Sequence, residues 1–165
     1  MPVIIHAERP DTPDAASLIE ELEAHLGALY PSESRHGFSI ERLISEHVAF
    51  FVLREDGAAA GCGGVKLFDT EFGEIKRMYV RPQYRGKGFA KRILTHLSDY
   101  ALVQGVTLLR LETGIHQHEA IRLYEQMGFY RIGPFKGYQP DPNSLFFEKS
   151  LTTSAASTTT EAAAG

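Results

Sequence analysis

The hydrophobic pattern of the first half of the chain predicts a strand, two helices and a three-stranded meander. Behind Thr12-Pro13, which is typical of a capped helix start, apolar residues recur at helical spacing until Pro31. Asp56-Gly57 between two apolar runs is a strong signal for a two-residue hairpin. Three glycines at 61–64 indicate a bulge or a close backbone approach. The expected elements are a strand at Val3–Ala7, helices at 13–30 and Ser39–Ser45, and strands at Val48–Arg54, Ala59–Phe68 and Glu74–Arg81.

The second half of the chain predicts helices that alternate with strands. Apolar residues at 89, 90, 93, 94, 97 and 101 mark one face of an amphipathic helix, and Gly105 stands where its end is expected. A second helix is expected at Glu119–Met127, and strands at Thr107–Glu112, Phe129–Ile132 and Leu145–Leu151. The order β-α-α-β-β-β-α-β-α-β-β predicts an α/β fold. Its mixed central sheet would combine an antiparallel meander with a β-α-β-α-β-β half.

Length and composition favour one folded domain. The chain has 165 residues, of which 43% are hydrophobic and 23% charged, an ordinary globular balance. We expect the domain to span residues 1–151, because the Ser/Thr/Ala-rich stretch 152–165 cannot bury a core and is typical of a mobile tail. The single cysteine, Cys62, excludes a disulfide framework and a structural zinc cluster. We see no signal peptide and no membrane-spanning apolar run, so the expected compartment is the cytoplasm.

Charge is distributed unevenly along the chain. Residues 1–70 carry 12 acidic and 5 basic side chains, a net of −7, whereas residues 71–150 carry 8 acidic and 12 basic side chains, a net of +4. A basic half in a chain of net charge −4 argues against general nucleic-acid binding. It fits a local site for a small polyanion.

A glycine loop, Gln83-Tyr84-Arg85-Gly86-Lys87-Gly88, lies between a predicted strand and a predicted helix. Glycines let a ligand approach the backbone, and a helix start offers unpaired N–H groups, so the loop suits a phosphate or pyrophosphate. The P-loop pattern is absent, and the dinucleotide pattern GxGxxG fails because Lys91 stands at its third glycine. A plain strand-to-helix turn with solvated charges is the alternative interpretation.

These features resemble the GCN5-related N-acetyltransferases, the GNAT superfamily. The loop matches that family's pyrophosphate motif, Q/R-x-x-G-x-G/A. Met78–Pro82 is similar to the family's cofactor-binding strand, and Ala120–Phe129 to its helix with a tyrosine followed by Gly-Phe. The likeness covers about residues 3–151. The chain also resembles a bacterial subgroup, typified by YsnE, at Gly73–Lys76, Leu111–Gly114 and Asp141–Ser144.

The resemblance implies an N-acetyltransferase that uses acetyl-CoA. It places acetyl-CoA between the third meander strand and the following strand, which splay apart in this family. The backbone of Met78 and Val80 would bind the pantetheine arm, and Gln117 stands where many relatives carry Asn. The implied cofactor-binding residues are Met78, Tyr79, Val80, Gln83, Arg85, Gly86, Lys87, Gly88, Phe89, Ala90, Lys91, Gln117 and Tyr124.

Three residues are candidates for proton transfer. The resemblance makes Tyr124 the acid that protonates the leaving thiolate, since a phenol can donate a proton. Because Tyr124 lies on an apolar helical stripe, a purely core role is the alternative. The resemblance also makes Glu74 the candidate base, since several relatives place a glutamate there, and a solvated charge beside a turn is the alternative interpretation. Glu112, on the strand opposite, is the second candidate base, with a strand-end ion pair as its alternative.

The acceptor is expected to be a small-molecule amine that attacks the thioester directly, without a metal. The alternatives are a protein N-terminus or lysine as acceptor, and a non-catalytic acyl-CoA-sensing module. The acidic first 70 residues could attract a cationic amine. His116 and His118 are expected to be exposed loop residues, and the oligomeric state is open, with a homodimer among the options. The candidate acceptor walls are Tyr30, His36, Phe38, Tyr138 and Asn143.

Overall fold

The computed structural model describes residues 2–35 and 37–151, so His36 and the predicted tail at 152–165 lie outside the described residues. The elements follow the predicted order, with two short 3-10 helices added. The strands are β1 (Val3–Ala7), β2 (Ala49–Glu55), β3 (Ala58–Phe68), β4 (Phe72–Val80), β5 (Leu108–Gly114), β6 (Tyr130–Ile132) and β7 (Ser144–Ser150). The helices are α1 (Pro13–Leu29), η1 (Ser32–Ser34), α2 (Ile40–Ser45), η2 (Pro82–Tyr84), α3 (Phe89–Val103) and α4 (His118–Gln126).

Local signals explain where the first helices begin and where the first hairpin turns. Thr12 caps α1 and Ser39 caps α2, each side chain accepting a hydrogen bond from the backbone N–H three residues on, at 3.3 and 3.2 Å. Asp56 and Gly57 have positive φ angles of 51° and 84°. The two-residue turn between β2 and β3 requires this conformation, so the predicted hairpin is confirmed.

The sheet has the order β1-β2-β3-β4-β5-β7-β6. β4 and β5 form its parallel pair, and the other neighbours are antiparallel, which confirms the predicted mixed sheet. β5 runs to Gly114, beyond its predicted end, because β7 pairs with it along its whole length. β4 begins at Phe72, earlier than predicted, because Phe72 pairs with Phe68 and shortens the turn.

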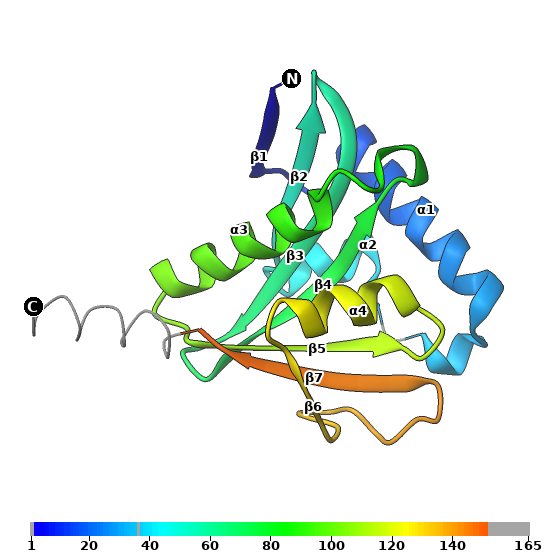
Figure 1. Ribbon diagram of the computed structural model, residues 1–165, viewed down its shortest axis with the longest axis vertical. Coiled ribbons are helices and arrows are strands. Elements are labelled where there is room, and N and C mark those ends of the chain that lie inside the picture. Colours follow the sequence, from blue (N-terminus) through cyan, green and yellow to red (C-terminus); the bar gives the residue numbers. More distant parts are fainter. Residues whose placement is uncertain (1, 36, 152–165) are drawn as a thin grey trace, which may run out of the picture.

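Helices cover both faces of the sheet (Figure 1). α1 and α2 pack on one face, where Leu18, Leu43 and Val52 belong to the smaller core. α3 and α4 pack on the other face, where Leu94 and Tyr124 belong to the larger core. The helical periodicity read from the sequence therefore marks the buried faces correctly.

The sheet opens between β4 and β5. Their pairing covers Gly73↔Leu109 and Glu74↔Arg110 and then stops, and the two arrows diverge beyond it (Figure 1). Beyond Glu74 and Arg110 the two strands are therefore no longer paired.

A bulge in β4 shapes the wall of this opening. Arg77 and Met78 together oppose Gly63 of β3, and Arg77 has a φ of 57°. A Cβ on Gly63 would lie 2.7 Å from the Met78 sulfur, so the predicted close approach is confirmed. The extra residue lets Lys76 and Arg77, neighbours in sequence, line the same cavity.

Candidate active site

A long cleft, here called the cofactor cleft, runs between the end of β4, the start of α3 and α4. Gly86 and Gly88 have φ angles of 83° and 76°, and nothing lies within 4 Å of the position of an added Cβ. Gly88 precedes α3, and no side chain caps this helix. The first N–H groups of α3 are therefore open to an anion in the cleft.

The structure brings together in this cleft all the predicted cofactor-binding residues except Gln83 and Lys87. Lys87 instead donates a hydrogen bond to Glu55, with 2.7 Å between Nζ and Oε1. The Val80 carbonyl accepts a hydrogen bond from Arg85 Nε at 3.1 Å. A pantetheine arm along β4 would compete with Arg85 for this oxygen.

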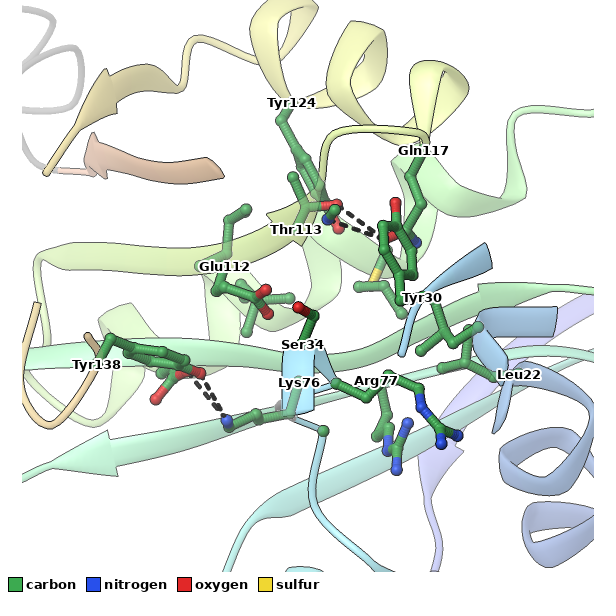
Figure 2. A pocket seen from close by; sticks show the side chains of 18 residues that line it. Leu22, Tyr30, Ser34, Lys76, Arg77, Glu112, Thr113, Gln117, Tyr124 and Tyr138 are labelled. Atoms are coloured by element: carbon green, nitrogen blue, oxygen red, sulfur yellow. Dashed lines mark hydrogen bonds and ion pairs between the residues drawn. The ribbon is translucent and has the colours of Figure 1, made fainter. Parts of the chain in front are cut away.

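A smaller cavity, here called the central pocket, lies in the opening between β4 and β5 (Figure 2). It shares Leu22, Met78, Gln117 and Tyr124 with the cofactor cleft. The two cavities therefore adjoin at these residues, and a group in one can reach a group in the other there.

Tyr124 lies at this junction. Its ring packs against Phe129 and Phe147, with centroid distances of 5.7 and 6.4 Å, and the residue is 5% exposed. Burial, and secondly the charge of Glu112, raises the pKa of Tyr124, so the phenol stays protonated at neutral pH. The hydroxyl has no hydrogen-bond partner among the described residues and is not sealed from solvent. Tyr124 can therefore pack in the core through its ring and still donate a proton through its hydroxyl.

Glu74 is buried and paired. The side chains of Glu74 and Lys76 are each 5% exposed, and Lys76 Nζ lies 3.0 Å from Glu74 Oε2. Tyr138 donates a hydrogen bond to the same carboxylate at 2.5 Å, and Lys76 Nζ donates to the Tyr138 hydroxyl at 3.1 Å. Burial lowers the pKa of Lys76 and raises the pKa of Tyr138. The interpretation of Glu74 as a solvated charge is therefore wrong.

Glu112 directs its carboxylate toward the middle of the central pocket, between Tyr124 and Lys76 (Figure 2). Ser144 Oγ donates a hydrogen bond to it at 2.7 Å. Next to burial, the charge of Glu112 helps to raise the pKa of Tyr124, and it also acts on the pKa of Lys76 and of Tyr138. Glu112 therefore lies between the junction of the two cavities and the Glu74 network.

Tyr30, which follows α1, positions the loop that carries Gln117. Its hydroxyl accepts a hydrogen bond from the His116 N–H at 2.9 Å, and the two rings stack at 5.6 Å. The Gly114 N–H donates to Gln117 Oε1 at 2.9 Å. A Cβ on Gly114 would overlap the Tyr30 hydroxyl, so this position requires glycine. The C-terminal end of α1 therefore holds part of the cofactor cleft in place.

Other predicted residues divide between cavity walls and scaffold. His116 and His118 are exposed, as predicted, and line the cofactor cleft, but His118 begins α4 and does not lie in a loop. Asn143 lines none of the three cavities, and its Nδ2 donates to Ser34 Oγ at 3.1 Å. Cys62 is buried, which raises its pKa to about 12 and keeps the thiol protonated and unreactive.

In the part of the chain that the structure describes, no three His, Cys, Asp or Glu side chains gather in the way that metal ligands would. None of the helices there is both long and apolar enough to cross a membrane.

A third cavity, here called the basic pocket, adjoins the central pocket on the side away from the cofactor cleft. The two share the Glu74, Lys76 and Tyr138 network. The cations of this pocket are not assigned to a site from the sequence. Glu74 and Lys76 could have indicated it, because residues two apart on a strand point to the same face of the sheet. The predicted wall residue Phe38 also lines it. Its cationic residues are Arg35, Arg42, Lys66, Lys76 and Lys136.

Comparison with known proteins gives the family. Residues 15–129 match the model of the acetyltransferase (GNAT) family. The chain belongs to the GNAT family. It is 44% identical over 151 residues to an IAA acetyltransferase of Azospirillum brasilense, a match that covers 90% of this chain and 98% of that relative. It is 38% identical over 137 residues to YsnE of Bacillus subtilis, an uncharacterized N-acetyltransferase, covering 82% of this chain and 91% of YsnE.

A solved structure agrees with this assignment. A Klebsiella pneumoniae protein assigned as an acyl-CoA N-acyltransferase has a TM-score of 0.78 and 37% identity, covering 90% of this chain and 97% of that one. The GNAT fold predicted from the sequence is thereby confirmed. The family and its relatives identify the chain as an acetyl-CoA-dependent N-acetyltransferase.

Proposed function

We propose that this GNAT enzyme transfers the acetyl group of acetyl-CoA to a small-molecule amine by direct attack. The supporting observation is that the cofactor cleft and the central pocket adjoin at Tyr124. A thioester in the cleft and an amine in the pocket would meet there. Holding two reactants in line can contribute roughly 7–11 kcal/mol toward the barrier.

The residues present fit acetyl-CoA, which supplies an activated acetyl group as a thioester. The uncapped start of α3 and the open space around Gly86 and Gly88 suit the pyrophosphate, and Lys91 adds a positive charge in the same cleft. Met78 lies in the bulged part of β4, beyond the residues at which β4 pairs with β5, and would offer backbone groups to the pantetheine arm there. Gln117 contributes an amide at the junction.

Tyr124 donates a proton to the leaving thiolate. Its raised pKa keeps the hydroxyl a donor throughout the neutral range, and the absence of a described internal partner leaves that donor available to the sulfur. General acids of this kind contribute roughly a hundredfold or more to rate.

Glu112 is the stronger candidate for the base. The Glu74 carboxylate already accepts hydrogen bonds from Lys76 and Tyr138 on the far side of the central pocket. The Glu112 carboxylate lies in the middle of the central pocket, between Tyr124 and Lys76, where the proposed amine would lie (Figure 2). In this scheme the amine loses its proton to Glu112, directly or through water, and the thiolate gains one from Tyr124.

An acceptor of small size is supported by the walls of the central pocket. Tyr30 and Ser34 border it from the α1 side and Tyr138 from the loop before β7. The Azospirillum brasilense relative, named for acetylation of IAA, matches almost over its full length.

The test is thiol release from acetyl-CoA in the presence of a panel of small amines, with acetylated product measured by mass spectrometry. We expect amine-dependent thiol release with an equal amount of acetylated amine. The matched variants Glu112→Gln and Glu74→Gln then separate the two bases. Glu112→Gln should lower kcat by roughly a hundredfold or more, with Tm little changed.

Glu74→Gln should mainly lower Tm, because it leaves the buried Lys76 ammonium without its carboxylate. Full kcat in Glu112→Gln, together with a large loss of kcat in a folded Glu74→Gln variant, would reverse the assignment. If no amine in the panel releases thiol above the rate of hydrolysis, the acetyltransferase proposal for small amines is wrong.

A further inference from the structure

The basic pocket is bordered by more positive than negative side chains. Five cations line it, against three carboxylates. The cations come from the segment after η1, from α2, β3 and β4, and from the segment between β6 and β7. Elements far apart in the sequence thus each contribute a positive charge to one cavity next to the central pocket.

Carboxylates that do not line the pocket pair with four of these cations. Glu23 lies 3.6 Å from Arg35, Glu46 pairs with Arg42, at 2.5 Å, and also with Lys66, and Glu71 lies 3.8 Å from Lys136. Around Arg42, Lys66 and Lys136, three cations are therefore matched by two carboxylates. The side chains of Arg42 and Lys136 are 57% and 52% exposed, so both can reach a ligand in the cavity.

Aromatic rings line the same cavity beneath the cations. The Arg42 guanidinium lies 3.9 Å from the centroid of the Phe38 ring, and Lys136 Nζ lies 5.0 Å from that of Phe68. Contacts of this kind hold the cations close to apolar surface. The pocket thus offers an apolar wall for a carbon chain and charged groups for one end of a ligand.

The acidic first half of the chain contributes one carboxylate, Glu33, to the lining of this pocket. Many of its carboxylates are used in ion pairs with the sheet and its loops. These pairs are Glu8 and Asp14 with Arg54, Glu21 with Arg81, Glu23 with Arg77, and Glu55 with Lys87. The structure therefore gives no support to the expectation that these residues attract a cationic amine.

We propose that the acceptor amine also carries a carboxylate, and that the basic pocket binds it. This inference rests on the proposed function, in which the amine lies in the central pocket. The central pocket and the basic pocket adjoin at Glu74, Lys76 and Tyr138. A compact molecule with an amine and a carboxylate separated by a short carbon chain can therefore lie with one group in each pocket. Arg42 and Lys136 would donate charge-assisted hydrogen bonds to the carboxylate.

The experiment compares L-amino acids with their primary amides as acceptors. Each pair keeps the amine and the side chain, and the amide lacks the negative charge. Because losing the carboxylate also makes the amine less basic, kcat/KM is expressed per concentration of unprotonated amine for both members. Thiol release gives kcat/KM for both members at fixed, saturating acetyl-CoA. We expect the acid to exceed the amide by roughly tenfold or more for the best side chain, as charge-assisted hydrogen bonds imply.

The double variant Arg42→Gln/Lys136→Gln should bring the ratio of acid to amide close to one. Lys149→Gln is the matched control, since Lys149 lies on β7 beside Phe129 and lines none of the three cavities. It removes a positive charge elsewhere and should keep the wild-type ratio. Equal kcat/KM values for acid and amide in the wild type, or an unchanged ratio in the double variant, would overturn the proposal.

Calorimetry distinguishes failure of this proposal from failure of the proposed function. The CoA-loaded protein is titrated with an N-acetyl amino acid and with the corresponding N-acetyl amino-acid amide. Tighter binding of the acid, lost in the double variant, supports the anion site even if no amine is acetylated. Equal binding of the two probes overturns the site even if neutral amines are acetylated well.

Discussion

Replacing Tyr124 with Phe separates catalysis from packing at the junction of the cofactor cleft and the central pocket. The substitution keeps the ring that packs against Phe129 and Phe147 and removes only the hydroxyl. Because that hydroxyl has no hydrogen-bond partner among the described residues, its loss leaves no buried group unpaired. The free energy of unfolding should therefore change by less than about 1 kcal/mol.

The rate should respond far more strongly than the stability. If the phenol protonates the leaving thiolate, removing it should lower kcat by roughly ten- to a thousandfold. A factor of this size corresponds to about 1.4–4 kcal/mol of barrier, well above the expected change in stability. Burial raises the pKa of Tyr124, so its titration should not contribute to the pH dependence of kcat near neutrality.

The assay measures thiol release at saturating acetyl-CoA, with thermal melting and calorimetric CoA affinity recorded on the same preparation. Tyr100→Phe is the matched control, because Tyr100 packs in the core against Phe51 and lines none of the three cavities. Wild-type kcat in Tyr124→Phe, with chemistry shown to be rate-limiting, would remove the phenol from the mechanism. A large fall in Tm that accompanies the fall in kcat would instead indicate a structural role for Tyr124.

Two further predictions concern stability and the loop of the cofactor cleft. A hydrogen bond from Arg54 lowers the pKa of Glu8 in the folded protein below its ordinary value of about 4.5. The ionised Glu8 side chain therefore stabilises the fold above about pH 4.5, and this stabilisation is lost as the pH falls through the pKa of Glu8 in the folded state. Glu8→Gln should cost about 1–3 kcal/mol at neutral pH and flatten the acid limb of a Tm-against-pH curve; an unchanged limb would contradict this. Gly114→Ala should displace Tyr30 and weaken CoA binding, measured by calorimetry, at least about tenfold. Gly133→Ala is the control and should bind CoA normally, because no atom lies within 4 Å of the added Cβ. Equal CoA affinities of the two variants would refute the positioning role of Tyr30.

The sequence predicts the fold well because its strongest signals are local. Helical periodicity, the caps at Thr12 and Ser39 and the Asp56-Gly57 turn each depend on a few adjacent residues. The ends of strands are less predictable, since β4 and β5 are lengthened by the partners with which they pair. The cofactor loop is also a local pattern, and the structure lines the cofactor cleft with most of the residues assigned to it.

The acceptor side of the site could not be predicted in the same way. Its position beside a turn leaves Glu74 open to two interpretations, a base or a solvated charge, and the sequence does not show that Tyr138 hydrogen-bonds to it from a loop 64 positions away. The basic pocket likewise depends on cations from five separate segments. Lys87 shows the reverse case, because its place in the motif suggests a ligand contact, whereas the hairpin turn brings Glu55 to its ammonium.

The most direct test of the account is a crystal structure with CoA and an N-acetylated product bound. The decisive quantity is the distance between the CoA sulfur and the Tyr124 hydroxyl. The account predicts hydrogen-bonding distance, with the pyrophosphate at the start of α3 and the product in the central pocket. A sulfur that lies away from Tyr124, or a product that does not enter the space between β4 and β5, would contradict it.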